Sequence, residues 1–293
     1  MFIYYSKNLI KIIKSILSKI YNSFFLKKNI CWNIAFFRNS FENINLDNVS
    51  IINNPKNRWF ADPFFVQVKK NYYIFFEDYN IKKKIGSISC AKINKDNSLK
   101  IYRDIIKEKF HLSFPFTFEY NKELFIIPES KDDNSIKLYK CTKFPNKWVF
   151  VKDLIKDIDG VDSIIFKHKK LWYLITCLQS KKNIYNRLIG FYSKNPIEGK
   201  WIKVKKFPLI KNNLSERNGG LICGKNRKLF RVGQIHLPSR YGYGYSINKL
   251  KNISKSNYQE DKINVKTELD NFKHIHTVNS KKNFTVIDYS KWK

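Results

Sequence analysis

Aromatic and β-branched residues recur along this chain as paired runs separated by short polar turns. The first pair extends from Arg58 to Glu77 and turns at residues 69–71, so it is typical of a β-hairpin. Four further pairs have the same order, with turns at 120–122, 168–170, 225–227 and 281–283. The five first strands are expected to start about fifty residues apart, near Asp62, Phe114, Asp162, Gly219 and His276.

This repeat predicts an all-β fold, a five-bladed β-propeller in which each repeat supplies one four-stranded sheet. We expect residues 30–293 to form it as one domain, because no linker-like segment interrupts them. The run at 31–37 is expected to complete the last blade and so remove an open sheet edge. Outer strands are expected at residues 85–91, 136–141, 148–150, 188–192, 201–204 and 243–247. The alternative is that unrelated hairpins share this spacing by chance.

Residues 1–29 differ from the rest because their apolar positions follow helical spacing. Ile10, Ile13, Leu17 and Ile20 share one face, while lysines fill another, which predicts a short basic amphipathic helix. Lysines interrupt the apolar face too often for a spanning helix or a signal peptide. The helix is expected either to lie on an anionic membrane or to pack against the flank of the propeller.

Composition limits the classes of partner. Hydrophobic residues make up 43% and aromatic residues 16% of the chain, which excludes general disorder. The net charge of +32 attracts anions such as lipid headgroups, although a genomic bias toward Lys, Asn and Ile would also produce it. No nucleic-acid motif is present, so specific nucleic-acid binding ranks last. Five cysteines without a CxxC pair are expected to be small buried residues in a reducing compartment.

The candidate chemistry follows from the geometry of a propeller. First strands start, and second strands end, on one face of such a fold. The polar residues at first-strand starts are Asp62, Asp162, Arg217 and His276, and those at second-strand ends are Glu77, Glu129, Gln234 and Asp288. Carboxylates that converge shift one another's pKa values, which can leave an acid and a base for glycosidic bond chemistry. Rim aromatics, Trp59, Phe60 and Phe114, are suited to stacking on sugars.

Each of these residues also has a structural interpretation. Asp62 and Asp162 could be turn residues, and Glu129 could pair with a rim lysine. Arg217 and Arg231 could be partners in structural ion pairs. The histidines do not show metal-ligand spacing, and phosphate-loop, serine-elbow and HExxH motifs are missing. We therefore expect neither a metal nor a cofactor.

The motifs resemble two related families. Ala61-Asp62-Pro63 at an early strand resembles family 43 glycoside hydrolases with the five-bladed fold. A longer set is similar to the amino-terminal domain of plant glucosamine inositolphosphorylceramide transferases and its stand-alone bacterial relatives: residues 59–64, 76–79, 111–115, 127–130, 138–139, 144–145, 148, 161–162, 234, 241–242 and 276–277. The hydrolase resemblance implies that Asp62 is a base and that Asp162 tunes pKa. The usual acidic motif of the fourth blade is replaced by residues 215–220, with Arg217 at the rim, which leaves Glu129 as the acid.

The sequence thus predicts a carbohydrate-active protein that cleaves or transfers a glycosyl unit in surface-polysaccharide or glycolipid assembly. The expected catalytic residues are Asp62, Glu129 and Asp162. The expected substrate-binding residues are Trp59, Glu77, His111, Arg217, Arg231, Gln234 and His276. The alternative is a non-catalytic propeller that binds a glycan or a lipid-linked sugar. We expect a cytoplasmic protein, peripheral on the inner face of the membrane; the sugar, the donor, the linkage and the stereochemical course stay open.

Overall fold

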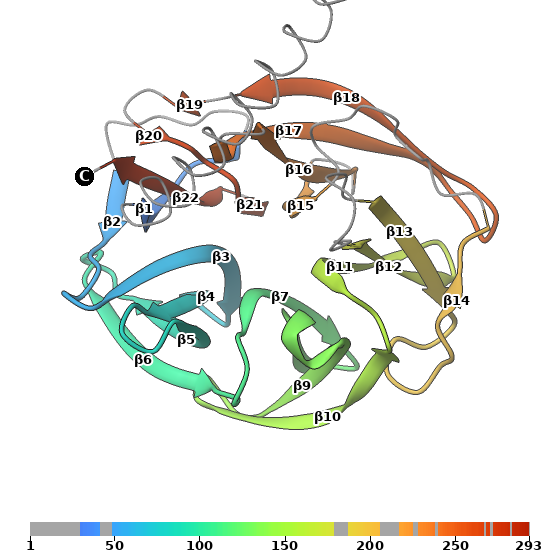
Figure 1. Cartoon of the computed structure of the whole chain (residues 1–293), viewed down its shortest axis with the longest axis horizontal. Helices are drawn as coiled ribbons and strands as arrows, with labels where there is room; N and C mark the ends of the chain where they lie inside the picture. Colours follow the sequence, from blue (N-terminus) through green and yellow to red (C-terminus); the bar gives the residue numbers. More distant parts are fainter. Residues whose placement is uncertain are drawn as a thin grey trace, which may run out of the picture.

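The computed structural model describes residues 30–41, 49–178, 187–205, 217–224, 228–237, 240–266, 268–269, 272–281 and 283–292. Apart from one short 3-10 helix, η4 (Lys131–Asp133), its regular elements are β-strands. They form sheets arranged as sectors around a common centre (Figure 1). The predicted all-β propeller architecture therefore agrees with the structure.

Three of the sheets have four antiparallel strands each, in chain order from one side to the other. The first contains β3 (Arg58–Val68), β4 (Asn71–Asn80), β5 (Ile85–Ile93) and β6 (Leu99–Ile106). The second contains β7 (Ser113–Tyr120), β8 (Glu123–Glu129), β9 (Ser135–Lys143) and β10 (Lys147–Lys156). The third contains β11 (Gly160–His168), β12 (Leu171–Leu178), β13 (Arg187–Ser193) and β14 (Ile202–Lys203).

The two ends of the described chain meet in an eight-stranded sheet of order β18-β17-β16-β15-β21-β22-β1-β2. Its first half contains β15 (Asn218–Cys223), β16 (Leu229–Leu237), β17 (Arg240–Ile253) and β18 (Tyr258–Lys266). Its second half contains β21 (Val278–Lys281), β22 (Phe284–Trp292), β1 (Ile30–Phe37) and β2 (Val49–Ile52). A short parallel pairing of β15 with β21 joins the halves. A separate pair consists of β19 (Glu268–Leu269) and β20 (Phe272–Lys273).

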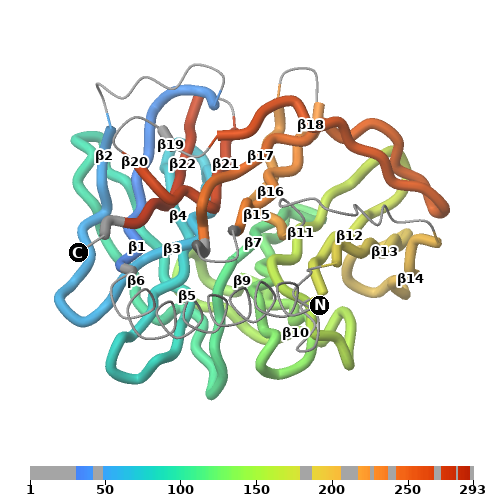
Figure 2. Tube along the Cα trace, turned by 45° about the horizontal axis from the view of Figure 1, so that its top comes forward, coloured from blue at the N-terminus to red at the C-terminus, as the bar shows by residue number. Residues whose placement is uncertain are grey.

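The innermost strands pack against one another in a closed ring. β3 contacts β7, β7 contacts β11, β11 contacts β15, β15 contacts β21, and β21 contacts β3. Figure 2 shows the same strands gathered at the middle of the molecule. This ring brings strand starts that are far apart in the sequence to one place.

Apolar side chains fill the spaces between neighbouring sheets. Ile34 and Phe36 of β1 share a buried cluster with Phe60 and Phe76 of the first sheet. The next cluster, between the first and second sheets, includes Phe75 of β4 together with residues of β8 and β9. Burial of each such side chain contributes about 1.5–3 kcal/mol. The core is therefore divided into wedges that fix the angle of each sheet.

The predicted hairpins are confirmed, and so is the pairing of residues 30–37 with β22. The sequence did not predict β2, β6 or β18. These edge or near-edge strands lack a strong apolar alternation; in β18 most side chains are exposed. The cysteines are free, but only Cys90 and Cys177 are buried, and Cys223 is exposed, so the prediction of buried cysteines is wrong there.

The predicted helix at residues 1–29 lies outside the described residues, as does the turn at 225–227. Within the described part of the chain, none of the helices is long and apolar enough to cross a membrane.

Candidate functional site

Three of the inner strands share an irregularity near their starts. Strand register shifts between residues 61 and 64 in β3, 113 and 116 in β7, and 161 and 164 in β11. Each shift contains a residue with positive φ: Asp62 at 50°, Phe114 at 44° and Asp162 at 49°. A bulge turns a side chain out of the ladder, and left-handed backbone costs about 1–2 kcal/mol for a non-glycine residue. The fold thus holds two aspartates at equivalent strained positions.

Asp62 is buried and connects three of the innermost segments. Its Oδ1 accepts a hydrogen bond from the Thr277 hydroxyl at 2.8 Å, and its Oδ2 accepts one from the Phe114 N–H at 3.3 Å. Its own N–H donates to Asp288 Oδ2 at 3.0 Å. These contacts fix the Asp62 carboxyl beside β7 and the segment before β21.

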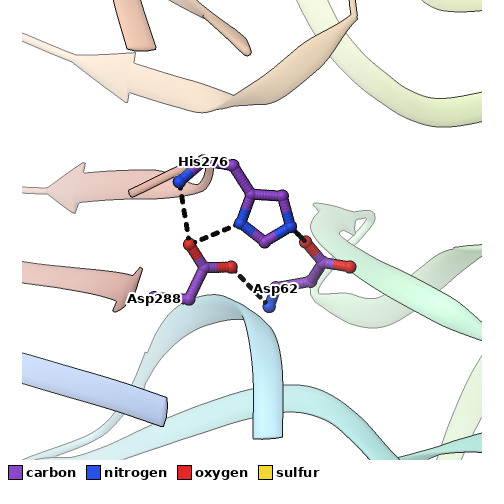
Figure 3. A group of neighbouring side chains, drawn as sticks. All are labelled: Asp62, His276 and Asp288. Carbon is purple, nitrogen blue, oxygen red and sulfur yellow. Dashed lines mark hydrogen bonds and ion pairs between the residues drawn. The ribbon is translucent and has the colours of Figure 1, made fainter. Parts of the chain in front are cut away.

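His276 lies between two carboxylates (Figure 3). Its Nδ1 is 2.7 Å from Asp288 Oδ1, and its Nε2 is 3.6 Å from Asp62 Oδ1. Its buried ring stacks on Trp32 of β1, with the ring centroids 4.0 Å apart. Burial alone would lower the pKa of His276, but the Asp288 carboxylate raises it above the ordinary value. The positively charged form is therefore favoured, and the ring is buried between the two carboxylates. The prediction that His276 binds substrate stays a prediction.

The pKa of Asp62 results from opposing effects in this cluster. Burial raises the pKa of Asp62 to about 6, although His276 lowers it. The carboxylates of Asp288 and Asp162 raise the pKa further. Asp62 thus changes its charge in a range close to neutral pH.

Asp162 and Glu129 are joined by one guanidinium. Arg217, directly before β15, binds Asp162 Oδ2 through Nε, and its Nη2 lies 3.3 Å from both Asp162 Oδ1 and Glu129 Oε2. The Asp162 N–H donates to Glu129 Oε2 at 3.3 Å. Burial raises the pKa of Asp162 to about 7, Arg217 opposes this, and Glu129 adds to it. The side chains of Arg217 and Glu129 keep 13% and 11% exposure, against 1% for Asp162. Solvent therefore reaches the cluster from the side of Arg217 and Glu129.

Two side-chain amides, those of Gln234 and Asn218, hold Asp162 in place. Gln234 Nε2 donates to Asp162 Oδ2 at 2.8 Å and to the Asn218 carbonyl at 2.6 Å. Asn218 Nδ2 donates to the carbonyls of Asp162 and Ile175 at 2.7 and 3.1 Å. Gln234 Oε1 is buried and has no hydrogen-bond partner among the described residues. Gln234 is thus oriented by its donor contacts and orients Asp162 in turn.

A row of aromatic rings lies on the side of the first sheet. Trp59 stacks on Tyr79, with centroids 4.4 Å apart and planes 16° apart. Tyr79 meets His111 edge to face at 5.9 Å. His111 Nε2 in turn lies 3.3 Å from Glu77 Oε1. Because Trp59 is only half-buried, this row connects the surface with a buried carboxyl.

Arg231 is the predicted site residue that the structure places elsewhere. Its fully buried guanidinium donates to Glu260 Oε2 at 2.8 Å, and the Tyr258 hydroxyl donates to the same oxygen at 2.6 Å. Its Nη1 lies 3.4 Å from Asn218 Oδ1, so Arg231 reaches the Asp162 cluster only through Asn218. These contacts agree with the structural ion pair that the sequence left open.

The sequence missed several residues that complete the site. Asp288 was noted only as a strand-end carboxylate, Thr277 and Asn218 only as members of longer motifs, and Trp32 only within the run at 31–37. Asn218 precedes the position equivalent to Asp162 in its repeat, so alignment of the repeats would have found it. The contact of Trp32 with His276 joins segments far apart in the sequence, so no local pattern indicates it.

One group in the described chain has metal-ligand types. Asp62, His276 and Asp288 each offer a ligand atom within 4.8 Å of the others. Asp288 Oδ1 accepts hydrogen bonds from the backbone N–H groups of His276 and Thr277, and it contacts His276 Nδ1. Since these atoms are already engaged with one another, the three residues fit a hydrogen-bonded relay better than a metal centre. The expectation of no metal stays a prediction.

Comparison with known proteins places the chain in a family. Residues 38–289 match the family described as glucosamine inositolphosphorylceramide transferase 1, N-terminal. The chain belongs to this family. The transferase 1 of Arabidopsis thaliana is 34% identical over 210 residues, which are 69% of this chain and 27% of that protein. The one from Oryza sativa subsp. japonica is 30% identical over 213 residues, 71% of this chain and 28% of its own. This family member thus spans little more than a quarter of these relatives.

Solved structures show the fold of the family member. The catalytic domain of a Coprinopsis cinerea GH62 α-L-arabinofuranosidase has a TM-score of 0.57 at 8% identity, covering 90% of this chain and 99% of that one. Zg3597, a family 117 glycoside hydrolase of Zobellia galactanivorans, has a TM-score of 0.56 at 12% identity, covering 89% and 90%. Both resemblances predicted from the sequence are confirmed, and the fold is that of propeller glycoside hydrolases.

Proposed function

We propose that this protein cleaves or transfers a glycosyl unit in the assembly of a glycolipid or a surface polysaccharide. Its relatives are named glucosamine inositolphosphorylceramide transferases, and its fold neighbours are glycoside hydrolases. Both comparisons support a carbohydrate-active protein. The chemistry is assigned to the carboxylates at the centre of the ring.

The observation that carries this proposal is the pair of buried aspartates at equivalent bulges. Asp62 and Asp162 have pKa values raised to about 6 and about 7, so each can bind or release a proton near neutral pH. Glycosyl chemistry needs a group that takes a proton, a role that suits Asp62, and neighbours such as Asp162 that set the charge around it. Strained backbone at both residues supports a functional rather than a purely structural reason for their positions.

The residues take the following roles in this proposal. Asp62 is the base or nucleophile-like carboxylate, and Asp162 orients and tunes the cluster. Glu129, which solvent reaches, is the acid carried over from the sequence. Arg217, on the solvent side of the cluster, holds a sugar hydroxyl or an anionic group of the substrate, and Trp59 stacks on a sugar ring.

A non-catalytic glycan-binding protein is the second candidate. It is favoured by Arg217, whose guanidinium bridges Asp162 and Glu129 and so neutralises two of the carboxylates that catalysis would use. In this alternative the same site recognises sugar without bond cleavage. Lipid-linked sugar would then be retained rather than converted.

Parallel measurements of turnover and binding separate the two candidates. The parent protein, Asp62→Asn and Glu129→Gln are incubated with nucleotide sugars and aryl glycosides, and released nucleotide or phenol is measured. Binding to a glycan array is measured on the same samples, and Glu119→Gln, at an exposed position of β7, serves as the control. Loss of turnover by about 10²–10⁴-fold in Asp62→Asn with binding retained supports the enzyme, and Glu129→Gln shows whether Glu129 contributes to turnover. Glycan binding without turnover in the parent supports the binding protein instead.

The architecture and location complete the proposal. We propose that the eight-stranded sheet consists of two blades, which makes five blades with the three four-stranded sheets and places residues 30–293 in one domain. The closed ring of inner strands supports this division. The cytoplasmic face of an anionic membrane is proposed as the working surface, and the lysine-rich segment 1–29 as the contact.

A further inference from the structure

Glu77 is a buried carboxyl at the edge of the carboxylate cluster. It lies on β4 opposite Ala61, the residue before Asp62, and only 4% of its surface is exposed. The charged groups that act on it are the carboxylates of Asp62, Glu129 and Asp288 and the guanidinium of Arg217. Three of these four are negative. Burial first, and these carboxylates second, raise the pKa of Glu77 well above its ordinary value.

His111 does not compensate a negative charge on Glu77. The Gly86 N–H donates to His111 Nδ1 at 2.9 Å, so Nδ1 is the acceptor and the hydrogen of the neutral ring is on Nε2. Burial lowers the pKa of His111, which keeps the ring neutral. Nε2 is 3.3 Å from Glu77 Oε1, yet Oε1 has no partner in hydrogen-bond geometry among the described residues. The imidazole therefore presents an N–H and no lone pair to Glu77, so it cannot take the Glu77 proton.

The close approach of Glu77 and His111 to the backbone requires a glycine at position 86. A Cβ added to Gly86 would lie 2.8 Å from His111 Cε1, 2.9 Å from Glu77 Oε1 and 2.5 Å from the Leu112 carbonyl oxygen. Glycine at this position thus allows the two side chains to pack against the start of β5. Glu77 and His111 are therefore packed against the first sheet.

Glu129, the acid expected from the sequence, has the opposite surroundings. Both of its hydrogen bonds come from donors, the Arg217 guanidinium and the Asp162 N–H, and both end on Oε2. Oε2 of Glu129 is thus engaged by a guanidinium and a backbone N–H, whereas Oε1 of Glu77 has no hydrogen-bond partner among the described residues. A proton donor requires a carboxyl that stays neutral at the working pH, and Glu77 is placed among neighbours that keep it so.

We infer that Glu77, rather than Glu129, is the proton donor of the site, with His111 and Gly86 as its positioning residues. This inference rests on the proposed glycosyl chemistry and assigns one of its steps. The row of Trp59, Tyr79 and His111 connects the half-buried Trp59 with Glu77.

The step is balanced without any further reactant. The O–H bond of Glu77 breaks, and the proton moves to the leaving-group oxygen, which takes the electron pair of its breaking bond to the anomeric carbon. The oxygen of water or of an acceptor hydroxyl forms the new bond to that carbon and gives its proton to Asp62. Glu77 is then the carboxylate and Asp62 the acid, and exchange with solvent restores both.

The protonation state is tested without any substrate. The full chain is labelled with ¹³C at glutamate carboxyl carbons, the Glu77 signal is assigned by its loss in Glu77→Gln, and its shift is followed against pH. Glu119→Gln is the control for the loss of an exposed carboxyl. We expect Glu77 to titrate well above the ordinary glutamate pKa of about 4.3. A midpoint at or below that value overturns the inference.

The role of Glu77 is tested on any glycoside or nucleotide sugar that the parent turns over. Glu77→Gln should lower kcat by about 10²–10⁴-fold for a poor leaving group, and much less for an acidic phenol that departs without a proton. An equal loss with both leaving groups, or normal turnover, overturns the donor role alone. Absence of turnover in the parent overturns the proposed enzyme function and the donor role together, even if Glu77 titrates as expected.

Discussion

The residues that organise the centre of this molecule are those in the least favourable local states. Asp62 and Asp162 have left-handed backbone, and both carboxyls are buried. A buried carboxyl favours its proton, whereas a guanidinium or imidazolium nearby favours its loss. The result is a cluster in which protonation is divided among several groups, and its pH response belongs to the cluster as a whole.

Asp162 should make the protein less stable as pH rises. The folded-state pKa of about 7 exceeds the ordinary aspartate value of 3.8, so the folded state binds this proton more tightly than the unfolded state. The stabilisation is complete below about pH 4 and is lost as pH rises through about 7. In Asp162→Asn, the fall in unfolding free energy over this range should shrink by roughly 2–4 kcal/mol, measured by urea unfolding at several pH values.

The matched control is Asp159→Asn, which changes an exposed carboxylate close to Asp162 and should keep the parent slope. Only the change of the unfolding free energy with pH is compared, because the substitution of Asp162 also removes a charged partner from Arg217 at every pH. An unchanged slope in Asp162→Asn would show that Asp162 is ionised throughout, as its ion pair with Arg217 alone would dictate.

Sequence reasoning located most residues of the central carboxylate cluster but not their partners. Asp62, Asp162, Glu129 and Gln234 could be predicted because they are at equivalent ends of hairpins, and strand ends on one face converge in a propeller. The bridge made by Arg217 could not be predicted, because it depends on side-chain conformations in three different sheets. Nor could the burial of Arg231, since the acidic partner Glu260 is on an edge strand that the sequence did not reveal.

At the scale of elements, the repeated unit is a hairpin, and its first strand is bulged near its start in β3, β7 and β11. The hairpins were predictable because their strands are apolar runs separated by short polar turns. This holds for the pairs β3 and β4, β7 and β8, and β11 and β12. The bulges were not predictable, because a register shift leaves no compositional mark apart from an occasional proline or glycine. The strand β1 joins the carboxyl-terminal strand to the rest of its sheet, since it pairs with both β22 and β2.

Two truncations separate the proposed membrane segment from the closing strand. Removal of residues 1–29 should leave cooperative thermal unfolding intact and release the protein from anionic liposomes, because it takes away the lysine-rich apolar segment. Removal of residues 1–37 also deletes Ile34, Phe36 and Phe37, which are buried. It should lower the unfolding temperature by more than about 10 °C. Circular dichroism and liposome sedimentation measure both effects.

Each truncation has an outcome that would contradict its prediction. Liposome binding that is unchanged without residues 1–29 would assign the attraction to the lysines of the propeller surface instead. If the chain without residues 1–37 unfolds at the same temperature as the full-length chain, closure by β1 contributes little to stability.

At the scale of the molecule, charge is strongly segregated. The chain has a net charge of +32, yet its centre contains Asp62, Glu77, Asp162 and Asp288. The positive surface repels itself in the compact state, and it also attracts anionic partners from a distance. The fold class was readable from repeat length alone, whereas this segregation required the positions of the side chains.

Added salt should therefore stabilise the folded protein. Raising sodium chloride from about 0.05 M to about 0.5 M shortens the Debye length from roughly 14 Å to roughly 4 Å and weakens the repulsion among surface lysines. We expect the unfolding temperature to rise by a few degrees, measured by differential scanning calorimetry at constant pH. A fall over the same range would indicate that surface ion pairs, rather than like-charge repulsion, dominate the electrostatic balance.

The pairing of β1 with β22 has a mechanical consequence. In this antiparallel register Ile30 is opposite Trp292, and Phe37 is opposite Thr285. A force that separates the two ends would therefore act on one pair of residues at a time and peel the strands apart like a zipper, instead of shearing all eight pairs together. In longer relatives, segments attached at these two points would leave the sheet side by side. Tension between them would therefore reach the hub early, because Trp32 of β1 stacks on His276 and Ile34 of β1 is opposite Asp288 of β22.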